Sequence, residues 1–517
     1  MYSKKILSTV AAVAVVSTGL MAFDTNTNQE IINESGRAGQ YTGGVSATED
    51  LNLSLDQRGD ALIFPYYSMA VDSRGKKWET EIVVRNTSPK ATVAKVALYR
   101  KKDSRELVDF NIYLSPYDAM RFVIKDRNIY SIDGSVPMGS TQTNPIHGAR
   151  ADDADFADVD NREEFSVLGS DALSVLQRPD SDTGYVVVYG MTQYQDGDTL
   201  ASAESDLNYH DNSLERKALH KELWKDYRRL LDDCRPNWRA SYGSNGSIGG
   251  FEDGMMTVVV PAPDTNVGCA TTSDSVLADE GYELENFGDV DTNTLVGTVR
   301  ISQADGVQSR DLLLPATALA NLTKDNMILW SEGEYAALHD RRIVNGKYDE
   351  NGVRADARAF LIKSAYYTYS KDSKANQLLI TQPMKRVLTQ LGNDDGYWQN
   401  ITNENPYGGF KIAGNTFDED ETIDGESINI TRGTFTSPFN TTGFVDSTYN
   451  DELHILANLE EDEQIVHDTD YFGNNDGFMY ITFQGNTEGL PAIVTQMTGS
   501  KIDHIAQTNW IYAPTIK

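Results

Sequence analysis

Long hydrophobic runs are missing from this sequence, apart from one near its start. The apolar run from Ile6 to Val16 is about half the roughly 20 residues that a membrane-spanning helix needs, and no later stretch approaches that length. Lys4 and Lys5 precede the run and Ala22 ends a small-residue cleavage site after it, which is the order found in a secretory signal peptide. We therefore expect residues 1–22 to be removed on export, leaving a protein of the cell surface, the extracellular space or the periplasm.

Cysteine is almost absent, because the 517 residues include only Cys234 and Cys269. Two cysteines exclude the multiple-disulfide framework of small secreted domains. Since free thiols are uncommon after export, we expect one disulfide between Cys234 and Cys269, and two buried, reduced cysteines are the alternative. Such a bridge joins positions 35 residues apart (269 − 234). In the chain-entropy model it would stabilise the protein by about 3 to 4 kcal/mol.

Basic residues are scarce relative to acidic ones: 45 Lys and Arg stand against 77 Asp and Glu, for a formal net charge of −32. Loss of Lys4 and Lys5 with the signal peptide would lower this to −34 (−32 − 2). The negative charge disfavours nucleic acid and anionic membranes as partners, because both would be repelled. It favours cation binding or association with a basic partner, and a surface that simply stays dispersed is the plainer interpretation.

Motifs that carry catalytic chemistry are also missing. The sequence has no His-Glu-x-x-His or Gly-x-Ser-x-Gly, and the Gly-rich run 243–250 lacks the Lys-Ser or Lys-Thr of a phosphate-binding loop. We therefore assign no catalytic or cofactor-binding residue and predict that the protein is not an enzyme, while a hydrolase with a dispersed site stays open. The histidines show no metal-binding spacing: His147, His210, His220, His339, His454, His467 and His504.

Strand signals are abundant, and they are densest between Gly59 and Ile124. In the range 78–85 the residues alternate, with Ile82 and Val84 on one side and Glu81 and Arg85 on the other, which is the period of a half-buried strand. Similar apolar runs at 61–64, 92–99 and 107–114 are joined by short polar turns. This pattern predicts a mainly β fold of antiparallel, immunoglobulin-like β-sandwich domains, with long loop insertions and one helical insertion.

The length of the chain predicts more than one domain. After the signal peptide we expect a flexible N-terminal arm at 23–57 and a first β-sandwich domain at 58–200. A helical insertion at 201–272 is predicted from the apolar spacing between Ser213 and Leu231, and it carries both Cys234 and Cys269. A second β-rich domain follows at 273–517 and is expected to share strands with the first.

Calcium is the one cofactor that the sequence suggests. Hard cations bind several oxygen ligands from one loop, and Asp468, Asp470 and Asp476 lie in a loop whose glycines let the chain wrap. Asp289 and Asp418 begin similar alternating runs. None of these loops completes the helix-loop-helix calcium pattern, so a solvated turn is the alternative for each.

Two blocks stand out, GDALIFPYY at 59–67 and DFNIYLSPYD at 109–118, followed in order by a helix leading into Cys234 and by Gly489-Leu490-Pro491. Together they resemble a largely uncharacterised family of secreted proteobacterial proteins. Gln382-Pro383-Met384-Lys385-Arg386 departs from the Phe-Pro-Thr-Lys that the family tends to have. In size, acidity and low cysteine content the chain is also similar to surface-layer proteins of marine proteobacteria. The family implies no catalytic residues.

Three hypotheses for function follow. The first is an exported structural protein of the cell surface, a surface-layer or extracellular matrix subunit that associates with itself or with other surface components. The second is a secreted carbohydrate- or peptide-binding module, and the third is a hydrolase with a dispersed site. The binding module would use an aromatic platform, whereas the alternative places the same aromatic side chains in the sandwich core: Tyr66, Tyr67, Trp78, Tyr113 and Tyr117.

Overall fold

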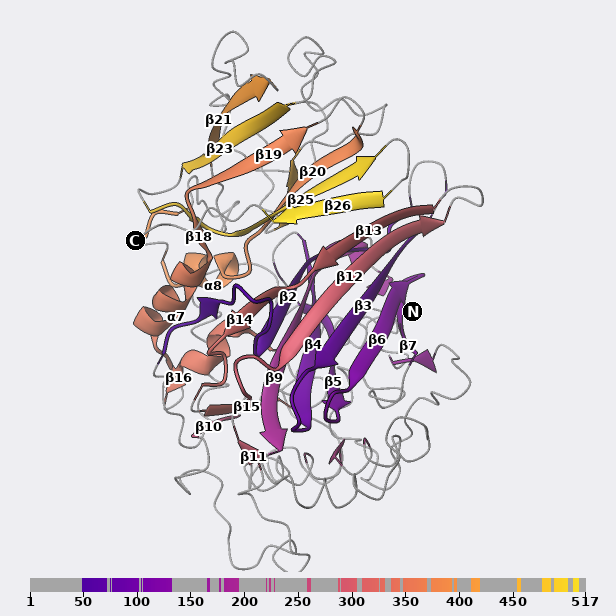
Figure 1. Cartoon of the computed structure of the whole chain (residues 1–517). Helices are drawn as coiled ribbons and strands as arrows, with labels where there is room; N and C mark the ends of the chain where they lie inside the picture. Colours follow the sequence, from indigo (N-terminus) through magenta and orange to yellow (C-terminus); the bar gives the residue numbers. More distant parts are fainter. Residues whose placement is uncertain are drawn as a thin grey trace, which may run out of the picture.

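The computed structural model is mainly β, as the sequence predicts, and its strands are almost all antiparallel (Figure 1). Among the residues it describes, two stretches form α-helices with defined bounds. The described residues are 49–71, 75, 77–101, 104, 106–132, 165–167, 176–177, 181–194, 220, 223–224, 227, 258–261, 287–288, 290–304, 309–324, 326–330, 336–344, 347–369, 373–392, 395–397, 411–418, 453–456, 477–484, 488–500 and 505–510.

A seven-stranded sheet forms the central layer. Its strand order is β1-β14-β2-β9-β4-β5, and β11 also pairs with β9. β4 and β9 are buried along nearly their whole length, since this sheet is covered on both faces. The strands are β1 (Asn52–Leu53), β2 (Ala61–Ser68), β4 (Thr92–Arg100), β5 (Glu106–Leu114), β9 (Thr183–Tyr194), β11 (Phe287–Gly288) and β14 (Thr317–Ala320).

A ten-stranded sheet lies against it, and Figure 1 shows β13, β12, β3 and β6 in front of β2, β4 and β9. Its order is β22-β20-β25-β26-β13-β12-β3-β6-β7-β8, in which only β13 and β26 are parallel neighbours. The strands are β3 (Trp78–Asn86), β6 (Ala119–Lys125), β7 (Asn128–Ser131), β8 (Phe165–Ser166), β12 (Leu295–Ala304), β13 (Ser309–Pro315), β20 (Ser373–Thr381), β22 (Leu453–Leu456), β25 (Ile493–Ser500) and β26 (Ile505–Trp510).

The space between the two sheets holds one hydrophobic core, and alternation along the strands decides which side chains enter it. Ile82 and Val84 of β3 face Phe110 and Ile112 of β5 across the layer, and all four are fully buried. Phe110 also meets Phe122 of β6 edge to face, with ring centroids 5.5 Å apart. The period-two pattern read from the sequence therefore places the correct faces inward, and the sandwich is confirmed.

A second core covers the other face of the seven-stranded sheet. There Tyr113 of β5 and Tyr189 of β9 pack with helical and loop segments, including Trp224, Tyr227 and Trp330. The segments around this core include the 3-10 helices η5 (Leu338–Arg342) and η6 (Arg358–Phe360) and the helices α7 (Glu350–Ala357) and α8 (Lys385–Gln390).

Short sheets complete the described structure. β19, β23 and β21 form a three-stranded antiparallel sheet, and three further pairs of strands are β10–β15, β16–β17 and β18–β24. Their bounds are β10 (Val258–Pro261), β15 (Asn326–Leu329), β16 (Ile343–Val344), β17 (Lys347–Tyr348), β18 (Leu361–Ile362), β19 (Ser364–Tyr369), β21 (Lys411–Asp418), β23 (Gly477–Gln484) and β24 (Leu490–Pro491).

Strands from the range 273–517 complete both sheets of the range 58–200. β12 pairs with β3 over nine positions, from Leu295 opposite Asn86 to Gln303 opposite Trp78. β14 pairs with β2 in the seven-stranded sheet. The two predicted ranges thus share strands, and the immunoglobulin-like form of the sandwich is not confirmed. No helix among the described residues is long and apolar enough to cross a membrane.

The predicted helix at 213–231 is described at four positions, and all four are helical: His220, Leu223, Trp224 and Tyr227. Their spacing puts them on one face, and all four side chains are buried against the central sheet layer. The apolar periodicity of the sequence thus identifies the buried face of this segment.

Candidate functional site

The sequence-predicted ligands and cysteines lie outside the described residues. This holds for Asp468, Asp470 and Asp476 of the calcium loop and for Cys234 and Cys269 of the disulfide. Both hypotheses stay predictions. Within the part of the chain that the structure describes, no group of three or more His, Cys, Asp or Glu side chains is arranged to hold a metal ion.

The five aromatic residues considered as a ligand platform are not gathered on one surface. Tyr67 is buried between the two sheets, whereas Tyr113 is buried on the opposite face of the seven-stranded sheet. Tyr66 and Trp78 are partly buried, and only Tyr117, in the turn before β6, is well exposed. At least Tyr67 and Tyr113 therefore contribute to packing.

The solvent-facing side of the ten-stranded sheet carries a group of arginines. Alternation sends Arg85 of β3, Arg121 of β6 and Arg300 of β12 away from the core, and all three are exposed. Glu81 and Leu313 lie on the same side, and Leu313 is 56 % exposed. We call this surface the outer face and define it by Glu81, Val83, Arg85, Arg121, Arg300 and Leu313.

Pairing register brings the members of the outer face together. Arg300 lies opposite Leu313 on one side and opposite Glu81 on the other, and Val83 lies opposite Arg121. Arg121 Nη1 lies 3.5 Å from Glu81 Oε1. Glu79, two positions before Glu81 on β3, is exposed on the same side, so three arginines stand beside two carboxylates there. The outer face is therefore more basic than the protein as a whole, which has a formal net charge of −32.

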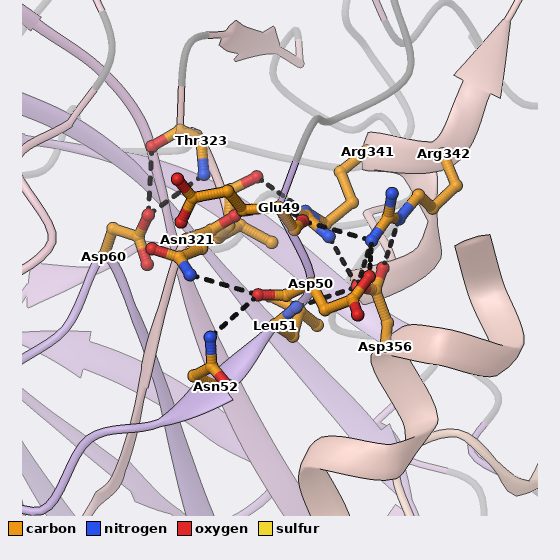
Figure 2. Close-up of polar contacts among 11 residues, drawn as sticks. Glu49, Asp50, Leu51, Asn52, Asp60, Asn321, Thr323, Arg341, Arg342 and Asp356 are labelled. Carbon is orange, nitrogen blue, oxygen red and sulfur yellow. Dashed lines mark hydrogen bonds and ion pairs between the residues drawn. The ribbon is translucent and has the colours of Figure 1, made fainter.

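A second polar group lies where α7 meets the start of the described chain (Figure 2). We call it the arginine cluster: Arg341 and Arg342 from η5 and Asp356 from α7. Arg341 Nη1 lies 2.5 Å from Asp356 Oδ1, and both side chains are completely buried. Arg342 contacts both oxygens of the same carboxylate, through Nη2 to Oδ1 at 2.7 Å and through Nε to Oδ2 at 2.9 Å. This fork geometry is the strong, bidentate form of an arginine–carboxylate pair.

The arginine cluster holds the segment that leads into β1. The backbone N–H of Leu51 donates to Asp356 Oδ1 at 2.9 Å, and the carbonyl of Glu49 accepts from Arg341 Nη2 at 2.6 Å (Figure 2). Leu51 itself is buried. Burial lowers the pKa of the Arg341 guanidinium, and the Asp356 carboxylate opposes that shift. Residues 49–57 of the predicted flexible arm are thus attached to the protein body, and residues 23–48 lie outside the described range.

Asp60 is a buried carboxyl beside this cluster (Figure 2). Its Oδ2 accepts from the backbone N–H of Thr323 at 3.0 Å and from the Thr323 hydroxyl at 3.3 Å. Its Oδ1 has no hydrogen-bond partner among the described residues. Burial raises the pKa of Asp60 to about 6, against the opposing effects of the Thr323 hydrogen bond and of Arg341.

A third polar group lies inside the second core, on the strands β4 and β5. We call it the lysine cluster: Lys95, Glu106 and Asp109. Lys95 Nζ lies 2.5 Å from Asp109 Oδ1, and both side chains are 0 % exposed. Glu106 Oε2 accepts from the backbone N–H of Ala336 at 3.0 Å. Burial raises the pKa of the Glu106 carboxyl well above its usual range, and the Asp109 carboxylate beside it raises it further.

A β-bulge puts Glu106 in this cluster. Along β5 the alternation sends Asp109 toward the second core and Val108 toward the first. Simple alternation would then send Glu106 to the side of Val108. The register shifts, however, so that Leu98 pairs with Val108 and the next residue, Tyr99, pairs with Glu106. The extra residue turns Glu106 to the side of Asp109.

Aromatic rings surround the lysine cluster and exclude water from it. Tyr99 and Tyr185 stack with centroids 5.1 Å apart, and Tyr189 lies 5.3 Å from Trp330. The hydroxyls of Tyr99 and Tyr189 are 2.7 Å apart. Burial raises the pKa of both well above the usual range, so both hydroxyls stay protonated at neutral pH. The ionisable groups of the lysine cluster therefore interact in a medium of low dielectric constant.

A histidine–carboxylate pair is a further buried polar group among the described residues. His220 Nε2 lies 2.7 Å from Asp118 Oδ2, and the hydroxyl of Ser115 donates to the same oxygen at 2.9 Å. In a hydrolytic triad the serine proton passes to the imidazole, whereas here the serine hydroxyl donates to the carboxylate. The contact attaches the turn 115–119 to the predicted helix at 213–231.

Comparison with protein-family models, with curated proteins and with solved structures finds no match for this chain. The resemblance to secreted proteobacterial proteins and to surface-layer proteins therefore stays a prediction.

Sequence reasoning did not identify the arginine cluster or the lysine cluster. Arg341-Arg342 lies between short elements with no periodic pattern, and its partner Asp356 is one acidic residue among 77. Lys95 carried a usable signal, because it stands at an inward position of an otherwise apolar strand. A buried lysine needs a buried partner, and that requirement alone would have directed attention to β4.

Proposed function

We propose that this protein is an exported structural protein of the cell surface, a surface-layer or extracellular matrix subunit whose copies associate through the outer face. The observation that carries the proposal is the set of exposed arginines, Arg85, Arg121 and Arg300, on an open sheet face of a strongly acidic protein. A locally basic face on one copy complements the acidic surface of the next.

Charge complementarity favours a second copy of this chain as the occupant. Like-charged copies repel one another at long range, and a basic face gives each approaching copy one favoured orientation. Because the basic face meets a different, acidic surface, the contact is head-to-tail and repeats from copy to copy. Calcium supports the same arrangement by bridging carboxylates that otherwise repel.

The interior of the protein supports a structural role in which the chain is placed under tension. The central sheet is covered on both faces, and Lys95 and Asp109 form a buried ion pair on it. Arg341 and Asp356 form another buried ion pair between η5 and α7. The segment that enters β1 is fastened to α7 by hydrogen bonds to charged groups. Such contacts resist a pull on the N-terminal end of the described chain.

The test reverses the charge of the outer face. The triple variant Arg85→Glu, Arg121→Glu, Arg300→Glu is compared with a matched triple variant that makes the same charge change elsewhere, at the exposed residues Arg58, Arg358 and Lys363. Sedimentation velocity and electron microscopy of the mature protein with calcium measure assembly. We expect the first variant to stay monomeric and the second to assemble like the native protein. Equal behaviour of both variants, or a native protein that is monomeric at high concentration, contradicts the proposal.

Location is tested separately. Cell fractionation with an antibody against the protein should find it abundant in the surface fraction, because a lattice or matrix subunit is needed in many copies. A protein confined to the cytoplasm contradicts the proposal.

A further inference from the structure

The side chains of the lysine cluster form an ion pair, and they are also placed as a nucleophile and an acceptor for a covalent reaction. Lys95 and Asp109 stand on neighbouring antiparallel strands, two positions apart along the register, with Nζ and Oδ1 at 2.5 Å and no exposure to solvent. Burying two charges away from water is expensive, and transfer of the proton from amine to carboxylate removes both charges. The neutral amine is a nucleophile, and the neutral carboxylic acid is an acceptor for it.

Glu106 supplies the third group that such a reaction needs. The β-bulge turns it toward Asp109, and the N–H of Ala336 fixes its Oε2 at 3.0 Å. Burial and the neighbouring Asp109 hold the pKa of the Glu106 carboxyl well above its usual range, which favours its protonated form. A protonated carboxyl beside a leaving oxygen acts as general acid, and its conjugate base then takes a proton from the attacking nitrogen.

We propose that Lys95 and Asp109 condense to an intramolecular isopeptide bond between β4 and β5, with Glu106 as the catalytic proton carrier. Lys95 Nζ attacks Asp109 Cγ, and the C–N bond forms as the C=O bond opens. The Asp109 hydroxyl then leaves as water with a proton from Glu106, which recovers a proton from the nitrogen. One amine and one carboxylic acid become one amide and one water, with no change of oxidation state.

The surroundings favour this reaction over a lasting ion pair. Holding the two groups in contact replaces a bimolecular step by an intramolecular one, which raises the effective concentration by several orders of magnitude. The aromatic side chains Tyr99, Tyr189 and Trp330 exclude the water that would hydrolyse the product. The amide also needs less solvation than the two charges it replaces.

Asn111 is the competing acceptor. It lies directly opposite Lys95 in the register and is fully buried, and its Nδ2 donates to the carbonyl of Trp330 at 3.1 Å. Reaction of Lys95 with Asn111 would release ammonia, whereas reaction with Asp109 releases water. The two acceptors are therefore distinguished by mass.

The first experiment measures the intact mass of the full mature protein after its N-terminus has been determined. We expect the measured mass to be lower, by the mass of one water molecule, than the mass calculated from the sequence between the two termini of the mature protein. Fragmentation should show a branched peptide that joins the segments containing Lys95 and Asp109. A mass equal to that of the sequence, with Lys95 recovered in a linear peptide, overturns the proposal. A loss of ammonia instead of water overturns the assignment to Asp109.

The second experiment assigns the roles by substitution. Glu106→Gln keeps the shape of the side chain but removes its proton exchange, so we expect a folded protein at full mass, with the fold checked by circular dichroism. The matched control is Asp291→Asn at the exposed ion pair with Lys90, which should keep the water loss. If Glu106→Gln still loses water, Glu106 is not the proton carrier. The mass of the native protein tests the bond by itself. The test therefore holds even if the Glu106→Gln variant fails to fold.

Discussion

Asp356 receives hydrogen bonds from two arginines and from the backbone of Leu51. Replacement by Asn removes the charge that neutralises Arg341 and Arg342 in a buried site. We expect Asp356→Asn to lower the free energy of unfolding by about 3 to 5 kcal/mol, the cost of leaving a buried charge without its partner. Urea unfolding followed by tryptophan fluorescence measures the change.

The matched control for this variant is Asp395→Asn, in a second ion pair of α7. Arg354 Nη1 lies 2.5 Å from Asp395 Oδ2, but both side chains are partly exposed, at 14 % and 26 %. Water and salt screen such a pair, so its loss is expected to lower the free energy of unfolding by about 0 to 1 kcal/mol. Equal losses for Asp356→Asn and Asp395→Asn would show that burial does not decide the strength of these contacts.

Asp60 gives a prediction for the pH dependence of stability. Its pKa rises from the model-compound value of 3.8 to about 6 in the folded protein. The folded state therefore holds the proton more tightly, and the free energy of unfolding falls as pH rises through the window from 3.8 to 6. A shift of about 2 pKa units corresponds to about 3 kcal/mol lost above that window.

Asp60→Asn cannot ionise and should lack this loss. We expect the melting temperature of the native protein to rise between pH 7 and pH 5 relative to that of Asp60→Asn, as measured by differential scanning calorimetry. Parallel pH profiles for the two proteins would contradict the assignment of the titration to Asp60. The control variant Asp126→Asn changes an exposed carboxyl and should follow the native profile.

At the scale of residues, the sequence predicts side-chain direction but not side-chain partners. Strict alternation along β4 puts Lys95 on the same side as Tyr99, and both side chains are buried in the second core. It could not place Glu106 beside Asp109, since that depends on a β-bulge with no glycine or other marker in the sequence. The buried partners of Arg341 are likewise set by tertiary contacts between segments far apart in the chain.

At the scale of elements, the strands of the first sandwich were predicted closely, and Pro65 shows where the prediction was wrong. The predicted run 61–64 stops before Pro65, because proline ordinarily ends a strand or lies at a sheet edge. β2 instead continues past Pro65 as an internal strand, because the register opposite β9 shifts between Phe64 and Tyr67. The bulge frees the proline from the ladder, and the Pro65 carbonyl accepts from the hydroxyl of Thr381 at 3.1 Å.

The element β1 was missed because it is only two residues long, Asn52 and Leu53, in a polar region. The low apolar content of this region predicts a flexible segment. The backbone of Glu49 and Leu51, however, forms hydrogen bonds with charged side chains, which amino-acid composition does not predict. A strand that is stabilised by residues far away in the sequence has no recognisable pattern in its own residues.

Truncation tests how much the anchored segment that enters β1 contributes to stability. Removing residues 23–48 from the mature protein should leave its melting temperature unchanged, because the sequence predicts a flexible arm there. Removing residues 23–53 should lower it by several degrees, since β1, Leu51 and the acceptor of Arg341 are lost. Thermal unfolding by circular dichroism compares the two truncations. Equal melting temperatures would show that β1 does not contribute to stability.

At the scale of the whole molecule, the sandwich was predictable from the sequence, but which strands form each of its sheets was not. The class follows from strand period and turn residues, whereas the pairing of β3 with β12 joins positions about two hundred residues apart. Periodicity contains no information about which strands become neighbours. The predicted boundary at 273 separates segments that the sheets bring together.

Calcium dependence is also a property of the whole molecule. If Asp468, Asp470 and Asp476 bind calcium, the ion stabilises the folded state by mass action. We expect the melting temperature to be higher in calcium than in chelator, and the variant with all three residues changed to Asn to lose the difference. Magnesium at the same concentration is the control, because it prefers a smaller, octahedral site. An unchanged midpoint would remove the calcium hypothesis.

The late position of β12 in the chain also affects how the protein is made. β3 and β6 are complete once residue 125 has been synthesised, but the other edge of β3 stays open until residues 295–303 follow. At about 5 to 20 residues per second, this interval lasts on the order of ten seconds or more. An unpaired strand edge of that duration invites pairing with another nascent chain. We therefore expect a chaperone that shields β3 until β12 arrives to raise the yield of folded protein.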